Sequence, residues 1–583
     1  MGSAKLSAPR PPQATRRPAI HEQFGVPVTD DYEWLEDDKN PETITFANTE
    51  NSYARSVLDG MSGRAGLRTR IATIIDRSVD KSSEPESKEV YPRDALDELR
   101  KKLPQETKDE TLSVAVFGDN DTVYAISHKG APRGKVVSYG LSSGRHFDMV
   151  PESDGVLTDL VATRSALYLI EVAFGSSRIR RLPLGIKPEP LAREVPKPEP
   201  SKPSKKARNR SSPRTSRKNP VPKPVRPLAT TIPLFDRGVT LAELPIVPLA
   251  RVLAAEKKDN DLLLRIETYL EPPAWYRYIA SEHRLERFRF DAISSLAAPV
   301  RSSKPKQAVP VRSSPTASTS RQLESALILT AYDSQPRAVS DTEVVREKCT
   351  SNGSTKVFMN IVRRKGAVLS GASPTLLIEN SDGILPSFRP WHRAWLDAGG
   401  ILAEPDLRGA GKTHEKVAND FFECAKALSS RGFTKPDKLG IMSQSANSFL
   451  MGAAMVQHPE MFRAVVSENG NYDSLGTRVK NETEFRTQVA FSPYYNTKNG
   501  TTYPAVLLMT SDGESRQIEN GQARKMVARL RATNSGSRPI LLRASERQEV
   551  AASDRLEREI DATVDMLAFL FNELGMQLPT ATH

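Results

Sequence analysis

Residues 438–450 read Lys438-Leu-Gly-Ile-Met-Ser-Gln-Ser-Ala-Asn-Ser-Phe-Leu450. The apolar run at the start predicts a buried strand, and residues 446–457 predict a helix. A sharp turn lies between them with Ser445 at its tip, which is the layout that exposes a nucleophilic serine. Glycine normally flanks such a serine two residues before and after it, but here Ser443 and Asn447 stand at those positions. The pattern therefore predicts the strand–turn–helix unit but does not by itself indicate an active serine.

The sequence on both sides of this unit alternates between apolar strands and amphipathic helices. This alternation predicts an α/β unit in the second half of the chain. Near the N-terminus, residues 41–75 predict two helices with a break at residues 60–63. In the α/β unit we expect strands at residues 374–378, 401–404, 438–442, 505–509 and 540–543, and helices at 420–431, 446–457, 521–531 and 556–574.

Between residue 112 and about residue 290 the sequence consists of short strand-like runs separated by turn signals. Examples of these runs are residues 112–117, 122–126, 136–139 and 166–170. Many short strands at such spacing predict a sandwich, a barrel or a propeller. Two tracts rich in proline, serine and basic residues, at 187–227 and 301–321, interrupt the pattern. We expect both tracts to be disordered, because their composition cannot bury enough apolar surface.

The charge of the chain is concentrated in the first of these tracts. The 583 residues carry a formal net charge of +12, and much of the excess lies between Lys187 and Arg226. Clustered lysines and arginines attract phosphates, so the tract is a candidate contact for nucleic acid or another anionic polymer. It contains no aromatic residue on which bases could stack. A solvated linker is therefore the favoured interpretation.

Cysteine usage and apolar content predict a cytoplasmic location. The only cysteines are Cys349 and Cys424; their spacing indicates neither a metal site nor a disulfide framework, so we expect reduced thiols. No stretch approaches the ~20 apolar residues needed to cross a membrane. Residues 1–17 lack the apolar core of a secretory signal. We therefore expect no membrane contact.

A second set of motifs runs through the chain in order. The first is Phe24-Gly-Val-Pro-Val-Thr-Asp-Asp-Tyr-Glu-Trp-Leu-Glu-Asp37. The others are Pro273-Ala-Trp-Tyr-Arg-Tyr278, Arg363-Arg-Lys365, Ser373-Pro-Thr-Leu-Leu377, Gly399-Gly-Ile401, Leu407-Arg-Gly409, Gln457-His-Pro-Glu-Met-Phe462, Phe491-Ser-Pro-Tyr-Tyr-Asn496 and Tyr503-Pro-Ala-Val-Leu-Leu508. In this order the motifs resemble those of the prolyl oligopeptidase family of serine peptidases.

The resemblance implies an α/β-hydrolase domain plus a seven-bladed β-propeller, although the sequence outside the basic tracts is short for seven full blades. The implied division is a disordered N-terminus at residues 1–20, a helical segment packing on the hydrolase domain at 21–80, the propeller at 81–340 and the hydrolase domain at 341–583. The implied ligand is an oligopeptide. We expect no cofactor, no metal and a monomer.

The resemblance also assigns the catalytic positions one by one. Ser445 matches the nucleophile, and the backbone N–H of Ala446 matches one donor of the oxyanion hole. The family's oxyanion tyrosine falls near Asn380. The acid matches Glu514, where the family has aspartate, with Asp512 as a neighbouring alternative. A further match is Arg516, which corresponds to the arginine that holds a substrate carbonyl.

The triad histidine has no counterpart at its expected place. The family carries it between the last strand and the last helix, where this chain reads Ala544-Ser-Glu-Arg-Gln-Glu-Val-Ala-Ala-Ser553. Glu549 or Val550 stands at the histidine position. A serine nucleophile needs a base that takes its proton and returns it to the leaving group. His414, on a loop that approaches the active site in relatives, is the rescue candidate.

Three functions follow from these observations. The favoured one is a peptidase homologue that keeps the fold and peptide binding but is catalytically impaired. The second is an active serine hydrolase that uses Ser445, Glu514 and a displaced base such as His414. The third is a binding protein that acts through the basic tract between Lys187 and Arg226.

Overall fold

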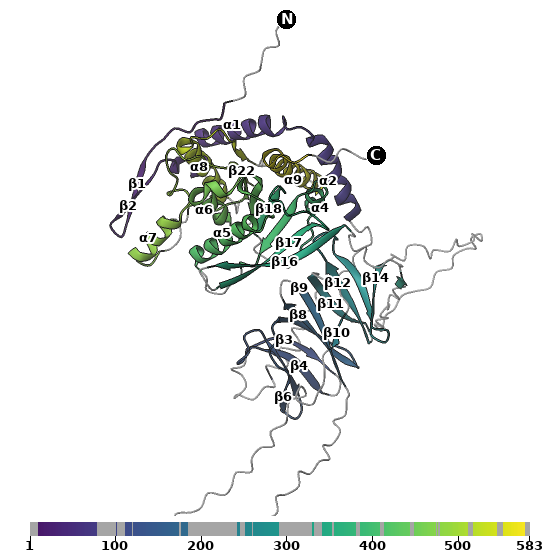
Figure 1. The fold of residues 1–583 in the computed structure, drawn as a ribbon. Coiled ribbons are helices and arrows are strands. Elements are labelled where there is room, and N and C mark those ends of the chain that lie inside the picture. The colour runs from purple at the N-terminus through teal and green to yellow at the C-terminus, as the bar shows by residue number, and fades with distance from the viewer. Residues whose placement is uncertain are drawn as a thin grey trace, which may run out of the picture.

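The computed structural model describes residues 10–78, 101, 111–118, 121–173, 176–184, 242–244, 251–258, 260–290, 329–331, 341–351, 355–379, 385–407, 413–443, 448–473, 475, 479–510, 517–544 and 552–577. Figure 1 shows an α/β domain that carries the N-terminal helices, and an all-β domain below it. The basic tracts at 187–227 and 301–321 lie outside the described residues. Their expected disorder therefore stays a prediction.

An eight-stranded sheet forms the centre of the α/β domain, in the order β16-β17-β19-β18-β20-β21-β22-β23. β16 and β17 form an antiparallel hairpin, and the strands from β19 to β23 run parallel to one another. Every residue of β18, β19, β20 and β22 is buried, which explains their mainly apolar sequences; Glu379, Glu404 and Ser443 are buried polar exceptions. The bounds are β16 Thr342–Ser351, β17 Thr355–Arg364, β18 Thr375–Glu379, β19 Ile401–Pro405, β20 Leu439–Ser443, β21 Ala464–Glu468, β22 Ala505–Met509 and β23 Ile540–Arg543.

Helices cover both faces of this sheet, and each face has its own hydrophobic cluster. One cluster contains Phe421, Met455 and Val527 from α5, α6 and α8. The other contains Trp395 and Leu567 from α4 and α9. α5, α6, α8 and α9 overlap the helices predicted at residues 420–431, 446–457, 521–531 and 556–574, whereas α4 and α7 were not predicted. Their bounds are α4 Pro390–Asp397, α5 His414–Ser430, α6 Phe449–Gln457, α7 Glu482–Phe491, α8 Gln517–Thr533 and α9 Ala552–Leu574. Among the described helices, none combines the length and apolar character needed to span a bilayer.

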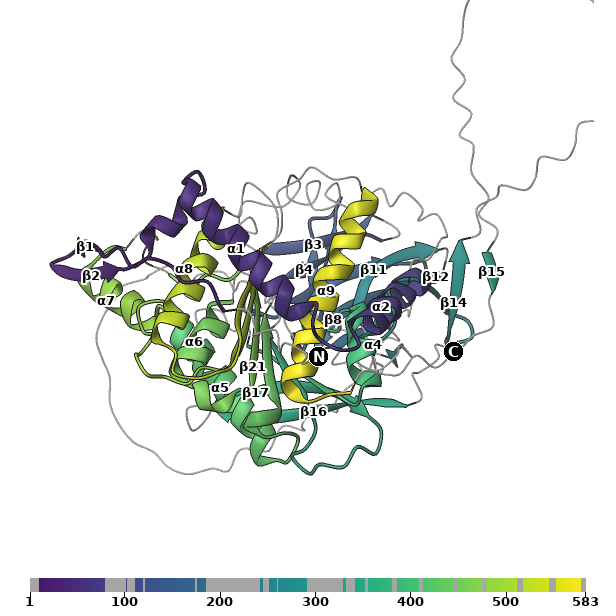
Figure 2. The same ribbon diagram turned by 90° about the horizontal axis from the view of Figure 1, so that it is seen from above.

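The N-terminal segment wraps around the α/β domain (Figure 2). It consists of a hairpin, β1 (Ala19–Gln23) and β2 (Val26–Asp30), a short 3₁₀ helix, η1 (Glu33–Glu36), and helices α1 (Pro41–Leu58) and α2 (Arg64–Ser78). The predicted break between the two helices is confirmed. Ala54 and Leu67 join the cluster of α4 and α9. The α/β domain thus includes the N-terminal helices in its core.

The expected disorder of residues 1–20 is wrong for residues 10–20. The indole Nε1 of Trp34 donates to the carbonyl of Thr15 at 3.0 Å. The backbone N–H of Arg17 donates to the carbonyl of Asp31 at 2.8 Å. Asp31 directly follows β2 and Trp34 lies in η1, so composition alone did not indicate these partners. Residues 1–9 lie outside the described part of the chain.

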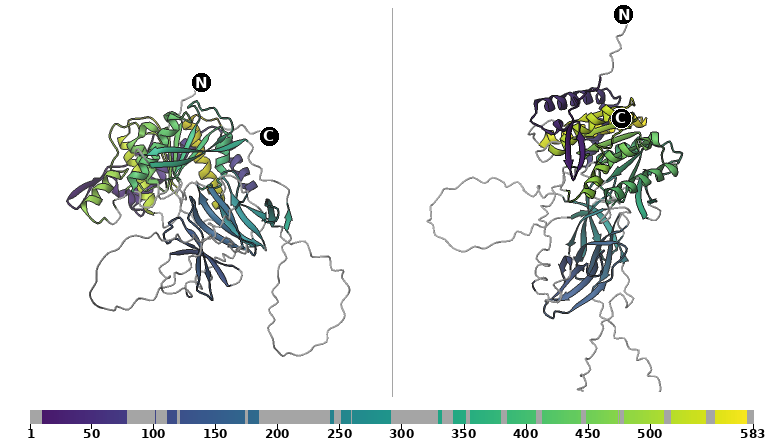
Figure 3. Two further views of the ribbon diagram at one scale, coloured as in Figure 1. Left: turned by 60° about the horizontal axis from the view of Figure 1, so that its bottom comes forward. Right: turned by 90° about the vertical axis from the view of Figure 1, so that its left-hand side faces the viewer.

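The all-β domain consists of three antiparallel sheets among its described residues, arranged as successive blades (Figure 3). Seven blades, as the resemblance implies, are not found in this part of the chain. The two basic tracts occupy sequence that further apolar strands would need. The sheets are β3 Leu112–Phe117, β4 Thr122–Ser127, β5 Lys135–Gly140 and β6 His146–Val150; β7 Val156–Ala162, β8 Ala166–Ala173, β9 Ser176–Pro183 and β10 Ala242–Glu243; and β11 Arg251–Lys258, β12 Asp261–Glu267, β13 Ala274–Ile279, β14 Arg284–Phe290 and β15 Leu329–Ala331.

The two cysteines form a disulfide, which corrects the expectation of reduced thiols. Cys349 near the end of β16 is bonded to Cys424 in the middle of α5, with Cα atoms 5.4 Å apart. Both residues are buried. Disulfides are typical of oxidising compartments. The pairing therefore weakens the argument from thiols for a cytoplasmic location.

Replacing both cysteines, Cys349→Ser together with Cys424→Ser, is expected to lower the free energy of unfolding by about 2–4 kcal/mol. The reason is that the bond links residues separated by 75 positions and so restricts the unfolded chain. Urea unfolding with and without dithiothreitol measures the effect. Reductant should destabilise the wild type and leave the double variant unchanged. Two alkylatable thiols in the native, unreduced protein would contradict the pairing.

Candidate active site

The strand before Ser445 and the helix after it are present as the elbow layout predicts. β20 ends at Ser443 and α6 begins at Phe449. The turn between them lies at the carboxyl end of a parallel strand, which is the edge where α/β sheets bind ligands. Three predicted site residues on this side, Ser445, Ala446 and Asn380, lie outside the described residues.

A hydrogen-bonded chain closes the base of this turn. Ser448 Oγ donates to Ser443 Oγ at 3.1 Å, and Ser443 Oγ donates to Glu379 Oε2 at 2.8 Å. All three side chains are buried. Ser443 stands where the elbow pattern has glycine, so its hydroxyl group is buried at this position. The carboxylate of Glu379 accepts the hydrogen bond that this hydroxyl needs.

Sequence reasoning missed Glu379 and Ser448, because neither belongs to the elbow motif. The signal that could have found Glu379 is its place as the last residue of an apolar strand. Strand pairing decides the contact, since Glu379 lies opposite Ser443 in the register of β18 and β20.

The predicted acid and the predicted histidine position follow neighbouring strand ends. β22 ends at Met509 and β23 ends at Arg543, and these two residues are opposite one another in register. Both strands are parallel to β20, so the loops that follow them leave the sheet at the edge that carries the elbow. The predicted residues of these loops lie outside the described part of the chain: Glu514, its alternative Asp512, Arg516, Glu549 and Val550.

Tertiary packing brings the rescue candidate His414 to the helix that follows the elbow. His414 is the exposed first residue of α5, and its ring centroid lies 4.3 Å from that of Phe449. Phe449 is the first residue of α6, four positions after Ser445 in the sequence. The side chain of Thr413 caps α5 by accepting a hydrogen bond from the backbone N–H of Lys416. The imidazole is therefore held next to the elbow helix.

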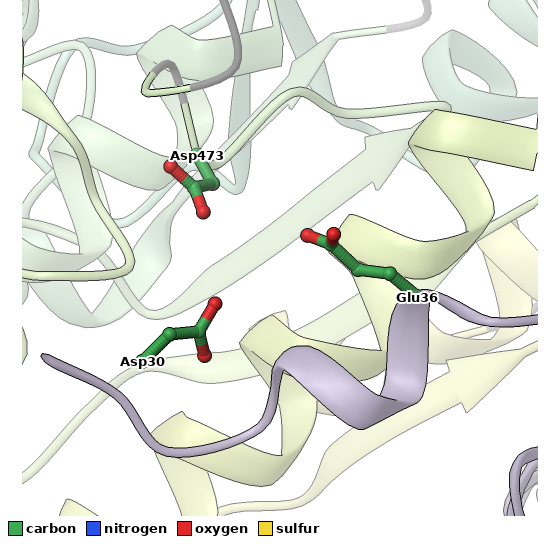
Figure 4. A group of neighbouring side chains, drawn as sticks. All are labelled: Asp30, Glu36 and Asp473. Atoms are coloured by element: carbon green, nitrogen blue, oxygen red, sulfur yellow. The ribbon is translucent and has the colours of Figure 1, made fainter. Parts of the chain in front are cut away.

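A second concentration of charge lies between the N-terminal segment and α8. Asp30, Glu36 and Asp473 bring carboxylate oxygens within 4.8 Å of one another (Figure 4). Lys525 Nζ lies 2.5, 2.6 and 2.9 Å from their oxygens. Burial acts to lower the pKa of Lys525, but the three carboxylates outweigh it and raise the pKa above its ordinary value. The ammonium group of Lys525 thus supplies the positive charge that balances the three carboxylates. Through these ion pairs the cluster joins the N-terminal segment to α8.

Two family models match the chain. "Prolyl oligopeptidase family" matches residues 386–577, and "Prolyl oligopeptidase, N-terminal beta-propeller domain" matches residues 11–91. The prolyl endopeptidase of Elizabethkingia miricola is 27% identical over 258 residues, which are 39% of this chain and 36% of that protein. An uncharacterised peptidase of Sinorhizobium fredii is 30% identical over 210 residues, which are 31% of this chain and 29% of that protein. The matches thus span about a third of the length of these relatives.

Solved structures share the fold of the chain. One comes from a structural and mechanistic study of two prolyl endopeptidases and the role of their inter-domain dynamics, with a TM-score of 0.64 at 19% identity over 97% of this chain and 100% of that chain. Oligopeptidase B from Leishmania major has a TM-score of 0.62 at 13% identity, over 98% and 99% of the chains.

A third structure is prolyl oligopeptidase B from Galerina marginata bound to a 35mer hydrolysis and macrocyclization substrate. Its TM-score is 0.54 at 18% identity, over 81% of this chain and 58% of that chain. At such identities the likeness shows the fold, a β-propeller joined to an α/β-hydrolase domain. The prolyl oligopeptidase model spans β20 and α6, whereas the propeller-domain model matches the N-terminal segment at residues 11–91. Over the two matched regions, residues 11–91 and 386–577, the chain is thus similar to the prolyl oligopeptidase family of serine peptidases.

Proposed function

We propose that this chain binds oligopeptides in the manner of its family and hydrolyses them poorly or not at all. The observation that carries the proposal is the sequence between β23 and α9, where the family has its catalytic histidine. Residues 544–551 contain no histidine, and the only histidine after His458 is His583 at the end of the sequence. Ser445 therefore lacks an imidazole at the position from which the family's base acts.

A carboxylate is a poor substitute for that imidazole. The base must take the serine proton and then return it to the leaving group near neutral pH, which suits a pKa near 7. Glu549 stands at or beside the histidine position, and a glutamate in water has a pKa of about 4.3. In subtilisin, removing the histidine lowers kcat by about 2 × 10⁶-fold. Loss of the histidine thus outweighs any gain from the acidic residues nearby.

Peptide binding does not need the histidine. Arg516 matches the family arginine that holds a substrate carbonyl, and the Galerina marginata relative has been solved with a peptide substrate bound. Hydrogen bonds to charged groups contribute about 1.5–3 kcal/mol each. The binding function therefore persists in this proposal while the hydrolytic step is lost.

Binding of a fluorescently labelled proline-containing peptide, followed by anisotropy, tests the proposal. We expect saturable binding by the wild type and roughly tenfold or greater weakening by Arg516→Ala, because one charged hydrogen bond is lost. Arg486→Ala is the matched control, since Arg486 is exposed and pairs with Glu482 within α7. Equal affinity of all three proteins, or no saturable binding by the wild type, would refute it.

A second candidate is a serine hydrolase with a displaced base. The contact between His414 and Phe449 favours it, because it holds an imidazole beside the elbow helix. The candidate requires Ser445 to react with a fluorophosphonate probe in the wild type and not in His414→Ala. His458→Ala is the control, because His458 lies 3.5 Å from Glu460 and contacts Phe422. An unlabelled wild type excludes this candidate.

A further inference from the structure

The turn between β12 and β13 projects from the third propeller sheet into the hydrolase domain, whose hairpin β16–β17 lies directly above that sheet (Figure 1). Tyr269 in this turn is 2% exposed and joins the hydrophobic cluster of α4 and α9, which also holds Trp391. The turn has a fixed shape, because Thr268 Oγ1 accepts hydrogen bonds from the N–H groups of the second and third residues after it, at 3.2 and 3.0 Å. The side chain of Tyr269, which belongs to the propeller domain, is thus held in the hydrophobic core of the hydrolase domain.

A buried carboxyl group lies at the hydroxyl end of Tyr269. The tyrosine hydroxyl donates to Glu404 Oε2 of β19 at 3.0 Å. Asn360 of β17 donates from Nδ2 to the same tyrosine oxygen at 3.2 Å. Glu404 is 4% exposed and Asn360 is fully buried. The cluster therefore joins a propeller residue to two strands of the hydrolase sheet without access to water.

Further contacts between the two domains lie on both sides of Tyr269. His392 Nδ1 of α4 lies 3.3 Å from the backbone carbonyl of Tyr269. Burial lowers the pKa of His392 to about 3, so this ring stays neutral above that pH. Glu267 at the end of β12 accepts a hydrogen bond from the N–H of Phe388 at 3.2 Å. The charged and titratable groups around the cluster are Arg389, His392, Arg346, Asp406, Glu267 and Arg251.

We propose that the Tyr269 turn is a proton-controlled latch, which holds the third propeller sheet against the hydrolase domain while Glu404 is protonated and loosens when Glu404 ionises. Glu404 is the control element because an ionised carboxylate in this buried position is poorly solvated. The hydroxyl of Tyr269 and the nearby charge of Arg389 offset only part of that penalty. Opening the latch hydrates the carboxylate.

The direction of the pH effect follows from the pKa of Glu404. Burial raises this pKa from its ordinary value of 4.5 to about 7, against the opposing effects of Tyr269 and Arg389. The closed state therefore holds the proton more tightly than the open state. Closure is favoured fully below pH 4.5, weakens as the pH rises through about 7, and changes little beyond that. Between pH 6 and pH 8 the opening equilibrium is expected to increase roughly tenfold.

The consequence for peptide uptake rests on the proposed function. A peptide that binds between propeller and hydrolase domain must enter past their contact. Loosening this contact above neutral pH should therefore speed association of the peptide. Latch opening itself can be measured without any peptide.

Hydrogen–deuterium exchange of the full chain tests the latch. We expect the protection factors of peptides covering residues 268–273 and 385–397 to fall about tenfold in the wild type from pH 6 to pH 8. Glu404→Gln, which imitates the protonated carboxyl, should keep equal protection at both values. Glu423→Gln is the control, because Glu423 lies on the surface of α5 and pairs only locally with Lys426; it should behave as the wild type.

Two results would overturn the latch. One is a wild type with equal protection at both pH values, which needs no variant. The other is a Glu404→Gln protein that loses protection as the wild type does. Peptide affinity measured at the same two pH values separates the proposals. If exchange responds as expected and no peptide binds, the proposed function fails and the latch stands.

Discussion

Wild-type protein and its Ser445→Ala variant are expected to release product from a proline-containing fluorogenic peptide at the same rate. The reason is the proposed loss of the base: residues 544–551, where the family has its histidine, offer no imidazole to take the proton of Ser445 and deliver it to the leaving amine. In subtilisin, loss of the histidine alone lowers turnover by about 2 × 10⁶-fold. The proposed oxyanion donors, Ala446 and Asn380, would offset only a small part of that loss, since one donor contributes ~10²–10³-fold.

A panel of fluorogenic peptides, assayed at high enzyme concentration, measures this result. Circular dichroism must show that both proteins are folded, and a family peptidase with a complete triad serves as the positive control. Hydrolysis by the wild type above the Ser445→Ala rate would contradict the proposed loss of catalysis. In that event His414→Ala identifies the base, because His414 is the imidazole that packing places beside the elbow helix.

The second large effect concerns stability. Lys525→Met is expected to lower the free energy of unfolding by about 3–5 kcal/mol, because it leaves buried carboxylates without their shared cation. Lys525 is 1% exposed and Asp30 is 2% exposed, so water cannot replace the lost ammonium. The change also removes the ion pairs by which Asp30 and Glu36 contact α8, so the N-terminal segment is held less tightly. The ion pairs of Arg524, Arg529 and Arg531 with this segment remain.

Urea unfolding monitored by circular dichroism measures the loss. Lys426→Met is the matched control, because Lys426 forms an exposed pair with Glu423 and such pairs contribute at most about 1 kcal/mol. Limited proteolysis should also cut the N-terminal segment faster in Lys525→Met than in the control. Equal unfolding midpoints of the two variants would show that the cluster of Asp30, Glu36 and Asp473 is not a stabilising anchor.

Much of the fold could be predicted from the sequence, because its signals are local. The apolar run at residues 438–442 predicts a buried strand, which is found as β20. The amphipathic pattern at residues 556–574 predicts the closing helix, which is found as α9. In contrast, the order of residues 10–20 depends on partners such as Trp34 and Asp31, and the disulfide depends on the packing of β16 against α5. Composition and spacing carry no information about either.

The sequence by itself determined the resemblance to the prolyl oligopeptidase family, the strand–turn–helix layout around Ser445 and the absence of histidine from residues 544–551. Only the tertiary structure decided which distant residues meet: Glu379 with Ser443 beneath the elbow, and Tyr269 with Glu404 between the domains. A sequence motif consists of residues that lie close together in the chain because the chemistry of the site requires them there. The pairs instead depend on strand register and domain packing, which bring together side chains that lie far apart in the chain.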